Sequence, residues 1–253
     1  MKIKQEKGDT VLKQSRSIRD VKLGKDIPMK SGLPTSSAVM LNIGTCGAGK
    51  SHFLESLFAK QWKKVFHKIF LICPEGSRSS YKNSFTKKVD ASRVFSELTV
   101  ENLDKISHEL ESDSAEVDDD DELEPEHYVL VIDDCQAAMR SADVSKALRF
   151  LMSTHRHFSG GLTIIICLQN LMALPKDCRD LASHVVLFRG LSSWQQMERV
   201  NAEFLPHLRK NEMLDLFKYI YDTPFNFSII SRRGDGGITK NFNPLQVTTD
   251  ELD

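Results

Sequence analysis

The sequence predicts an α/β fold in which helices sandwich a mostly parallel sheet. Five short runs of apolar residues recur along the chain, and stretches with helical spacing of apolar residues separate them. The runs are apolar at nearly every position, which is typical of strands that are buried on both faces. Alternating strands and helices with short connections indicate a doubly wound sheet.

The limits of the elements follow from the apolar runs and the residues that end them. We expect strands at 38–43, 68–73, 128–133, 162–168 and 184–188, and Pro74 ends the second of them. We expect helices at 51–66, 145–155, 192–204 and 206–221. In the second helix, Leu148, Leu151 and Met152 recur at the spacing that places them on one face.

The chain divides into three predicted parts. Residues 1–35 form a polar extension rich in lysine and arginine, residues 36–222 form the α/β core, and residues 223–253 form an edge strand and a tail. The strand is expected at 225–231, and Arg232 and Arg233 begin the turn that follows it.

An acidic segment at about 109–126 interrupts the predicted core between the second and third strands. The simplest interpretation is a solvated, partly disordered insertion. A docking patch for a basic partner, or a DNA mimic that restrains the protein's own basic surface, are the alternatives.

Composition narrows the class of protein. The chain has 253 residues and a net charge of −1, so the molecule as a whole has no bias toward polyanions. No apolar run reaches the roughly 20 residues of a membrane span, and the N-terminus lacks an apolar signal core. The five cysteines are scattered and form no metal-binding spacing, which favours reduced thiols in an intracellular protein.

A phosphate-binding motif follows the first predicted strand. It fits the pattern G-x-x-x-x-G-K-[ST] and comprises Gly44, Thr45, Cys46, Gly47, Ala48, Gly49, Lys50 and Ser51. The glycines allow a tight turn whose backbone N–H groups face a phosphate chain at the N-terminus of the next helix. Lys50 is expected to reach the β- and γ-phosphates, and the Ser51 hydroxyl to bind Mg²⁺. The motif predicts binding of a nucleoside triphosphate.

An acidic pair ends the third predicted strand, as in the Walker B pattern. Asp133 is expected at Mg²⁺, and Asp134 at the place of the acid that activates the attacking water. Such a pair favours hydrolysis over phosphoryl transfer to a second substrate. The alternative is a pair of carboxylates that cap the following helix.

Two further kinds of side chain suit a triphosphate site. Gln169 follows the fourth predicted strand, where an amide would sense the γ-phosphate. Arg156 and Arg179 flank the same strand, and either guanidinium, supplied by a neighbouring subunit, would stabilise charge on the γ-phosphate. The alternatives are a turn amide and ordinary surface or ion-pair arginines.

The layout of these motifs resembles the additional-strand, RecA-like class of P-loop ATPases. The finer pattern is similar to the FtsK–HerA superfamily of DNA pumps, and within it to the genome-packaging ATPases of poxviruses and virophages. The resemblance covers roughly residues 38–190. It is carried by residues 44–51, 131–134, 156–157, 163–170, 174–175, 179 and 186–189.

The resemblance implies an ATP- and Mg²⁺-dependent motor that translocates double-stranded DNA into a preformed capsid. It implies Lys50 and Ser51 on the nucleotide, Asp133 on Mg²⁺, Asp134 as water-activating acid, and Gln169 as sensor. Arg156 would be the trans-acting finger. It also implies a homo-oligomeric ring, a pentamer or hexamer, that binds DNA without sequence preference and docks on capsid or portal-vertex proteins. The expected location is the virion or the host-cell cytoplasm.

The sequence departs from the family at two positions, and other functions stay open. Many relatives have Glu at the position of Asp134, and many have Asn where this chain has Leu181. The alternatives are a nucleotide-gated scaffold ATPase of capsid assembly and a P-loop kinase, although no arginine-rich lid segment is present. No Asn-Lys-x-Asp guanine reader occurs, and residues 158–161 lie on the wrong side of the acidic pair for a transporter signature.

Overall fold

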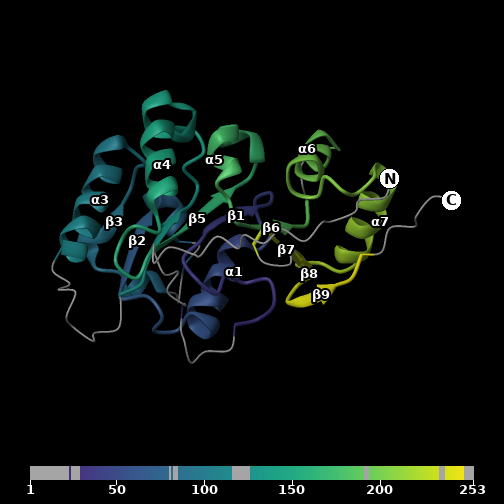
Figure 1. The fold of residues 1–253 in the computed structure, drawn as a ribbon, viewed down its shortest axis with the longest axis horizontal. Helices are drawn as coiled ribbons and strands as arrows, with labels where there is room; N and C mark the ends of the chain where they lie inside the picture. The colour runs from purple at the N-terminus through teal and green to yellow at the C-terminus, as the bar shows by residue number, and fades with distance from the viewer. Residues whose placement is uncertain are drawn as a thin grey trace, which may run out of the picture.

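The computed structural model describes Leu23 and residues 29–79, 81, 85–115, 126–190, 194–233 and 237–247. Within these residues, nine strands form one sheet in the order β3-β2-β4-β5-β1-β6-β7-β8-β9 (Figure 1). Most of the predicted basic extension, 1–35, and residues 116–125 of the acidic segment lie outside the described residues.

The parallel centre of the sheet confirms the five predicted strands. They are β1 (Val39–Ile43), β2 (Lys68–Ile72), β4 (Tyr128–Ile132), β5 (Leu162–Leu168) and β6 (His184–Phe188). β5 pairs with β4 on one side and with β1 on the other. The strand with Gln169 at its end therefore lies between the strands that carry the phosphate-binding motif and the acidic pair.

The two ends of the sheet differ from the prediction. A short parallel strand, β3 (Val94–Phe95), extends one edge. At the other end, β7 (Phe227–Ser231) pairs antiparallel with β6, and β8 (Ile238–Lys240) and β9 (Asn243–Leu245) follow it. The predicted edge strand at 225–231 is thus an interior strand, because the chain turns back and β8 pairs with its free side.

The helices also depart from their predicted limits. The first, α1 (Lys50–Ser56), passes into a π-helical turn at Leu57–Gln61 and ends before residue 66. The next two predicted helices correspond to α4 (Ala142–Thr154) and α6 (Trp194–Phe204), and the last to α7 (Lys210–Ile220). Short helices occur at α2 (Glu75–Arg78) and α5 (Lys176–Asp180), with 3₁₀ turns at Phe85–Lys88, Ala91–Arg93, Ala138–Arg140 and Leu171–Ala173.

One long helix, α3 (Val100–Ala115), is not predicted from the sequence. It includes the start of the acidic segment. Its buried residues Leu103, Ile106 and Leu110 share one face. On its polar side, Asp113 and Glu109 lie 2.5 and 3.6 Å from Lys68 Nζ. Residues 109–115 are therefore folded and ion-paired rather than part of a solvated insertion.

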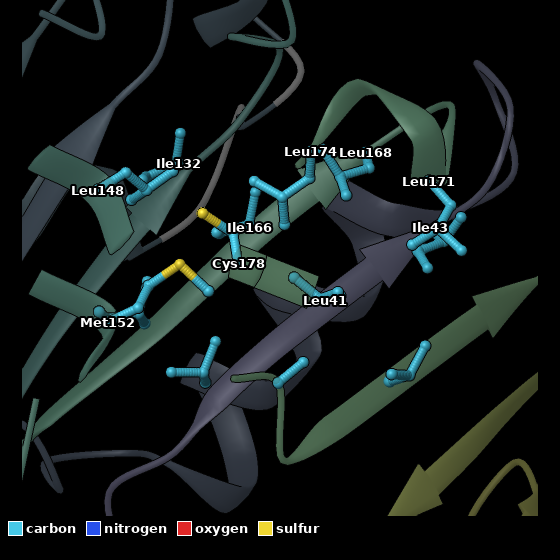
Figure 2. Close-up of a cluster of buried hydrophobic side chains, with 14 of the residues drawn as sticks. Leu41, Ile43, Ile132, Leu148, Met152, Ile166, Leu168, Leu171, Leu174 and Cys178 are labelled. Carbon is cyan, nitrogen blue, oxygen red and sulfur yellow. The ribbon is translucent and has the colours of Figure 1, made fainter. Parts of the chain in front are cut away.

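The sheet is buried on both faces, as its apolar strands predict. Helices α3, α4 and α5 lie over one face and α1 lies over the other (Figure 1). Figure 2 shows the apolar layer between the sheet and the helices α4 and α5. In this layer, Leu41 of β1 and Ile166 of β5 face Leu148 and Met152 of α4 and Cys178 of α5. Each fully buried side chain of this kind contributes about 1.5–3 kcal/mol.

Among the described residues, no helix combines the length and apolar character that a membrane crossing requires.

Candidate active site

The order of the strands brings the predicted site residues together at one edge of the sheet. The loops after β1, β4 and β5 all leave at carboxyl ends of parallel strands, where ligands of open α/β sheets bind. They open on one cavity of about 1030 Å³. Its walls include Gly47, Gly49, Lys50, Ser51, Asp133, Asp134 and Gln169.

The phosphate-binding loop has the backbone that its glycines predict. Gly47 and Gly49 have φ angles of 73° and 102°, in the left-handed region that favours glycine. The Lys50 ammonium donates hydrogen bonds to the carbonyl oxygens of Gly44 and Thr45, at 2.6 and 2.9 Å. The cation is thus held against the concave side of the loop. This arrangement suits a phosphate chain.

Asp133 is held at the end of β4 by burial and a hydrogen bond. Asp133 is only 8% exposed, and this burial raises the pKa of its carboxyl group above the usual value. The Tyr81 hydroxyl donates to its Oδ2 at 2.5 Å. Ser51, the other predicted Mg²⁺ ligand, lies near this hydroxyl.

Asp134 has a backbone conformation that a non-glycine residue rarely adopts. Its φ angle is 56°, and such left-handed residues cost about 1–2 kcal/mol. Ser77 Oγ donates to its Oδ2 at 2.6 Å, and the Gln169 amide lies 3.4 Å from its Oδ1. The surrounding structure fixes this carboxylate in the cavity, as is common where strain serves a function.

Gln136 ties the end of β5 to the loop that follows Asp134. Its side-chain oxygen accepts hydrogen bonds from the backbone N–H groups of Gln169 and Asn170, at 2.9 and 3.0 Å. This places Gln169 beside the acidic pair. Gln169 is predicted from its place at the end of a strand. Gln136, Ser77 and Tyr81 are not, because they lie in polar loops and in the short helix α2, which carry no motif.

The two candidate arginine fingers have different surroundings. Arg156 is exposed in the turn between α4 and β5, at the amino end of β5. The cavity lies beyond the carboxyl end of that strand, so Arg156 does not reach the site of its own chain.

The Arg179 guanidinium is bound within its own subunit. Its interpretation as a trans-acting arginine finger is therefore wrong. Arg179 is 3% exposed, and its Nε and Nη2 donate to the Glu203 carboxylate at 2.7 and 2.8 Å. Its Nη1 donates to the Leu174 carbonyl. Removing one partner of such a buried ion pair is strongly destabilising, because it leaves the other charge buried and unpaired.

Arg232 and Arg233, whose charges would suit contact with DNA phosphates, also bind within the chain. The Arg233 guanidinium donates to Ser36 Oγ and to the Ser37 carbonyl, and Arg232 donates to the carbonyls of Asp180 and Ala182. Both guanidinium groups hold the end of β7 against neighbouring segments of the chain. They are therefore less suited to contact the phosphates of a DNA backbone.

Several solved structures have a fold similar to that of this chain. The genome packaging NTPase B204 from Sulfolobus turreted icosahedral virus 2, in complex with AMP, is 14% identical. It matches 83% of this chain and 98% of its own with a TM-score of 0.56. B204, the DNA-packaging ATPase from Sulfolobus turreted icosahedral virus, is 15% identical over 84% and 98% of the two chains, with a TM-score of 0.54.

A third match is the pCW3 conjugation coupling protein TcpA with ATPγS. It is 14% identical over 81% of this chain and 60% of its own, with a TM-score of 0.55. No curated protein matches the sequence. The structural matches confirm the P-loop ATPase fold that the motifs predict.

The family comparison rests on the sequence itself. The family model described as "Poxvirus A32 protein" matches residues 30–231, which include the phosphate-binding loop, the acidic pair, Gln169 and both candidate arginines. The protein belongs to the poxvirus A32 protein family.

Proposed function

We propose that this protein is an ATP-hydrolysing motor that packages double-stranded DNA into a viral capsid. The observation that carries the proposal is the convergence of Lys50, Asp134 and Gln169 on one cavity in a member of the poxvirus A32 family. The fold is similar to that of B204, which is described as a DNA-packaging ATPase and whose structures include complexes with AMP, AMPPCP and ATPγS.

ATP would lie with its phosphates on the loop after β1. The backbone N–H groups of residues 47–51 and the Lys50 ammonium bind the phosphate oxygens. Ser51 and Asp133 supply a hydroxyl and a carboxylate, which are oxygen ligands of the kind that Mg²⁺ prefers. Tyr81, which donates to Asp133 and lies near Ser51, supports their pairing. When bound, Mg²⁺ would neutralise charge on the β- and γ-phosphates.

Asp134 would act as the general base. Its carboxylate accepts the proton of a water whose oxygen attacks the γ-phosphorus, while the bond from that phosphorus to the bridging oxygen of ADP breaks. Gln169 lies beside this carboxylate, so its amide is placed to contact the γ-phosphate and to respond when phosphate leaves.

Arg156 would complete the site of a neighbouring subunit in a ring. This proposal is supported by its exposure and by its distance along β5 from the cavity of its own chain. A trans-acting guanidinium stabilises charge that builds on the γ-phosphate during hydrolysis.

Complementation between two inactive variants tests this arrangement. Arg156→Ala and Lys50→Ala are each expected to lack hydrolysis, and a 1:1 mixture is expected to regain some. About one interface in four then pairs an intact phosphate loop with an intact Arg156, if the ring is head-to-tail. Mixing Lys50→Ala with the Lys50→Ala/Arg156→Ala double variant is the control and should stay inactive. A mixture of the two single variants that also stays inactive would contradict the trans role.

Steady-state ATP hydrolysis with and without double-stranded DNA tests the motor function. Contacts to DNA phosphates are sequence-independent and release counterions, so DNA should raise the rate and added salt should reduce the effect. The basic residues at 1–35 remain candidate DNA contacts. Duplexes of unrelated sequence and equal length should stimulate equally. A rate indifferent to DNA would favour the nucleotide-gated scaffold, with turnover tied to a capsid or portal-vertex partner in the virion or host cytoplasm.

Phosphoryl transfer to a small molecule is the second alternative. It is disfavoured by the acidic pair, Asp133 and Asp134, which is typical of P-loop proteins that hydrolyse their nucleotide. ATP consumption that requires an added nucleoside or small acceptor, and releases no inorganic phosphate, would support the kinase.

A further inference from the structure

The cavity continues beyond the phosphate loop into an apolar part. This part is lined by five phenylalanines, Phe53, Phe188, Phe225, Phe227 and Phe242. Phe53, Phe227 and Phe242 contact one another, with ring centroids 4.8–6.3 Å apart. The Lys30 ammonium lies 4.4 Å from the centre of the Phe242 ring. The wall beside the phosphate loop is therefore aromatic, and neither hydrolysis nor phosphate binding uses it.

Phe225 differs from the other four phenylalanines because its ring faces solvent. The residue is 71% exposed, whereas Phe53 and Phe188 are buried. Its φ angle is 64°, which is rare for a bulky side chain and strained. A single exposed apolar residue needs no explanation, but one held on a strained backbone in a cavity wall does.

The turn that carries Phe225 is rigidly built. The Asn226 side chain donates to the Ile220 carbonyl and to the Asp222 carboxylate, both at 3.0 Å. Asn241 donates from its amide to Asn226 at 3.1 Å and accepts from the Phe227 backbone N–H at 3.1 Å. These bonds fix the backbone on the C-terminal side of Phe225, so the direction of its ring is built into the fold.

The Phe225 ring lies directly beside the phosphate loop. A β-carbon added to Gly49 would be 3.8 Å from Phe225 Cδ1. Gly49 precedes Lys50 and the N-terminus of α1, where the phosphates of a nucleotide are bound. A nucleotide held there has its base within reach of this wall, and a base has the flat, apolar face that an aromatic ring stacks on.

We propose that Phe225 is the base-stacking residue of the nucleotide site and that the phenylalanine-lined part of the cavity receives the base. This inference rests on the proposed function, since it concerns the ligand whose phosphates lie on Lys50 and Ser51. The ligand class is a nucleoside triphosphate, with purines bound more tightly than pyrimidines because their rings offer more stacking area. Stacking does not depend on base hydrogen bonds, so adenine and guanine would differ little at this wall.

Binding of ATPγS and of inorganic tripolyphosphate to the purified full chain tests the inference by calorimetry. One base on one aromatic ring corresponds to roughly a 5- to 150-fold change in affinity. Phe225→Ala is expected to weaken ATPγS by about tenfold, while tripolyphosphate, which has no base, binds as to the wild type. Phe225→Trp should restore ATPγS binding, and the new indole should be quenched by ATPγS but not by tripolyphosphate.

Phe150→Ala is the matched control, since Phe150 is 60% exposed on α4 and does not line this cavity. It should leave both affinities unchanged. Equal affinity of wild type and Phe225→Ala for ATPγS would overturn the inference and leave the ATPase function intact. Equal loss of both ligands would assign Phe225 to shaping the phosphate loop. A wild-type protein that binds neither ligand would overturn both the inference and the proposed function.

Discussion

Lys50→Ala is expected to abolish ATP hydrolysis and to weaken nucleotide binding by about 100-fold. The ammonium is the cation that the loop holds against its own carbonyl groups, and it would exchange those bonds for phosphate oxygens. A charged hydrogen bond contributes about 1.5–3 kcal/mol, and two of them to phosphates account for a loss of this size. Calorimetry with ATPγS and a steady-state phosphate assay would measure both effects.

The control for this variant is Lys146→Ala, which removes an exposed lysine from α4, away from the cavity. It should bind and hydrolyse ATP as the wild type does. Circular dichroism of Lys50→Ala should match the wild type, since the hydrogen bonds of the ammonium go to carbonyl groups of its own loop. Wild-type affinity of Lys50→Ala for ATPγS would show that the loop after β1 is not the phosphate site.

Asp134→Asn is expected to bind ATP normally and to hydrolyse it about 10²- to 10⁴-fold more slowly, the range that a positioned general base contributes. Asparagine has the same shape, tolerates the left-handed backbone and can still accept a hydrogen bond from Ser77. The substitution thus removes the base and retains the geometry. Single-turnover hydrolysis, measured beside the ATPγS affinity, separates chemistry from binding.

A matched substitution, Asp143→Asn, changes an exposed carboxylate at the start of α4 and should leave turnover unchanged. Hydrolysis by Asp134→Asn at the wild-type rate would transfer the base role to another group. Loss of ATPγS binding together with hydrolysis would instead mean that Asp134 shapes the site.

The parallel centre of the fold is predictable from sequence because its signals are local. Runs such as 128–132 and 162–168 are apolar at nearly every position. The phosphate loop directly follows the run at 38–43, and the acidic pair directly follows the run at 128–132. Residues at the carboxyl ends of neighbouring parallel strands must then lie close together. Asp133, Asp134 and Gln169 were located for this reason, without knowledge of any contact.

The remaining features depend on contacts between distant segments. Helix α3 is rich in charged residues, and its acidic end is stabilised by Lys68 of β2, which lies 41 and 45 residues away. Tyr81 reaches the acidic pair from a loop, and Ser77 reaches it from the short helix α2, and neither segment carries a motif. Likewise, the Arg179–Glu203 ion pair joins α5 to α6, so the sequence cannot distinguish this buried arginine from an exposed one such as Arg156.

ATP-driven displacement of a third strand from a DNA triplex reports translocation itself, because it requires movement along the duplex as well as hydrolysis. We expect the wild-type protein to release a labelled third strand when ATP is added, from duplexes of any flanking sequence. Asp134→Asn should bind the same DNA and release nothing. DNA-stimulated hydrolysis by the wild type without release of the third strand would contradict translocation.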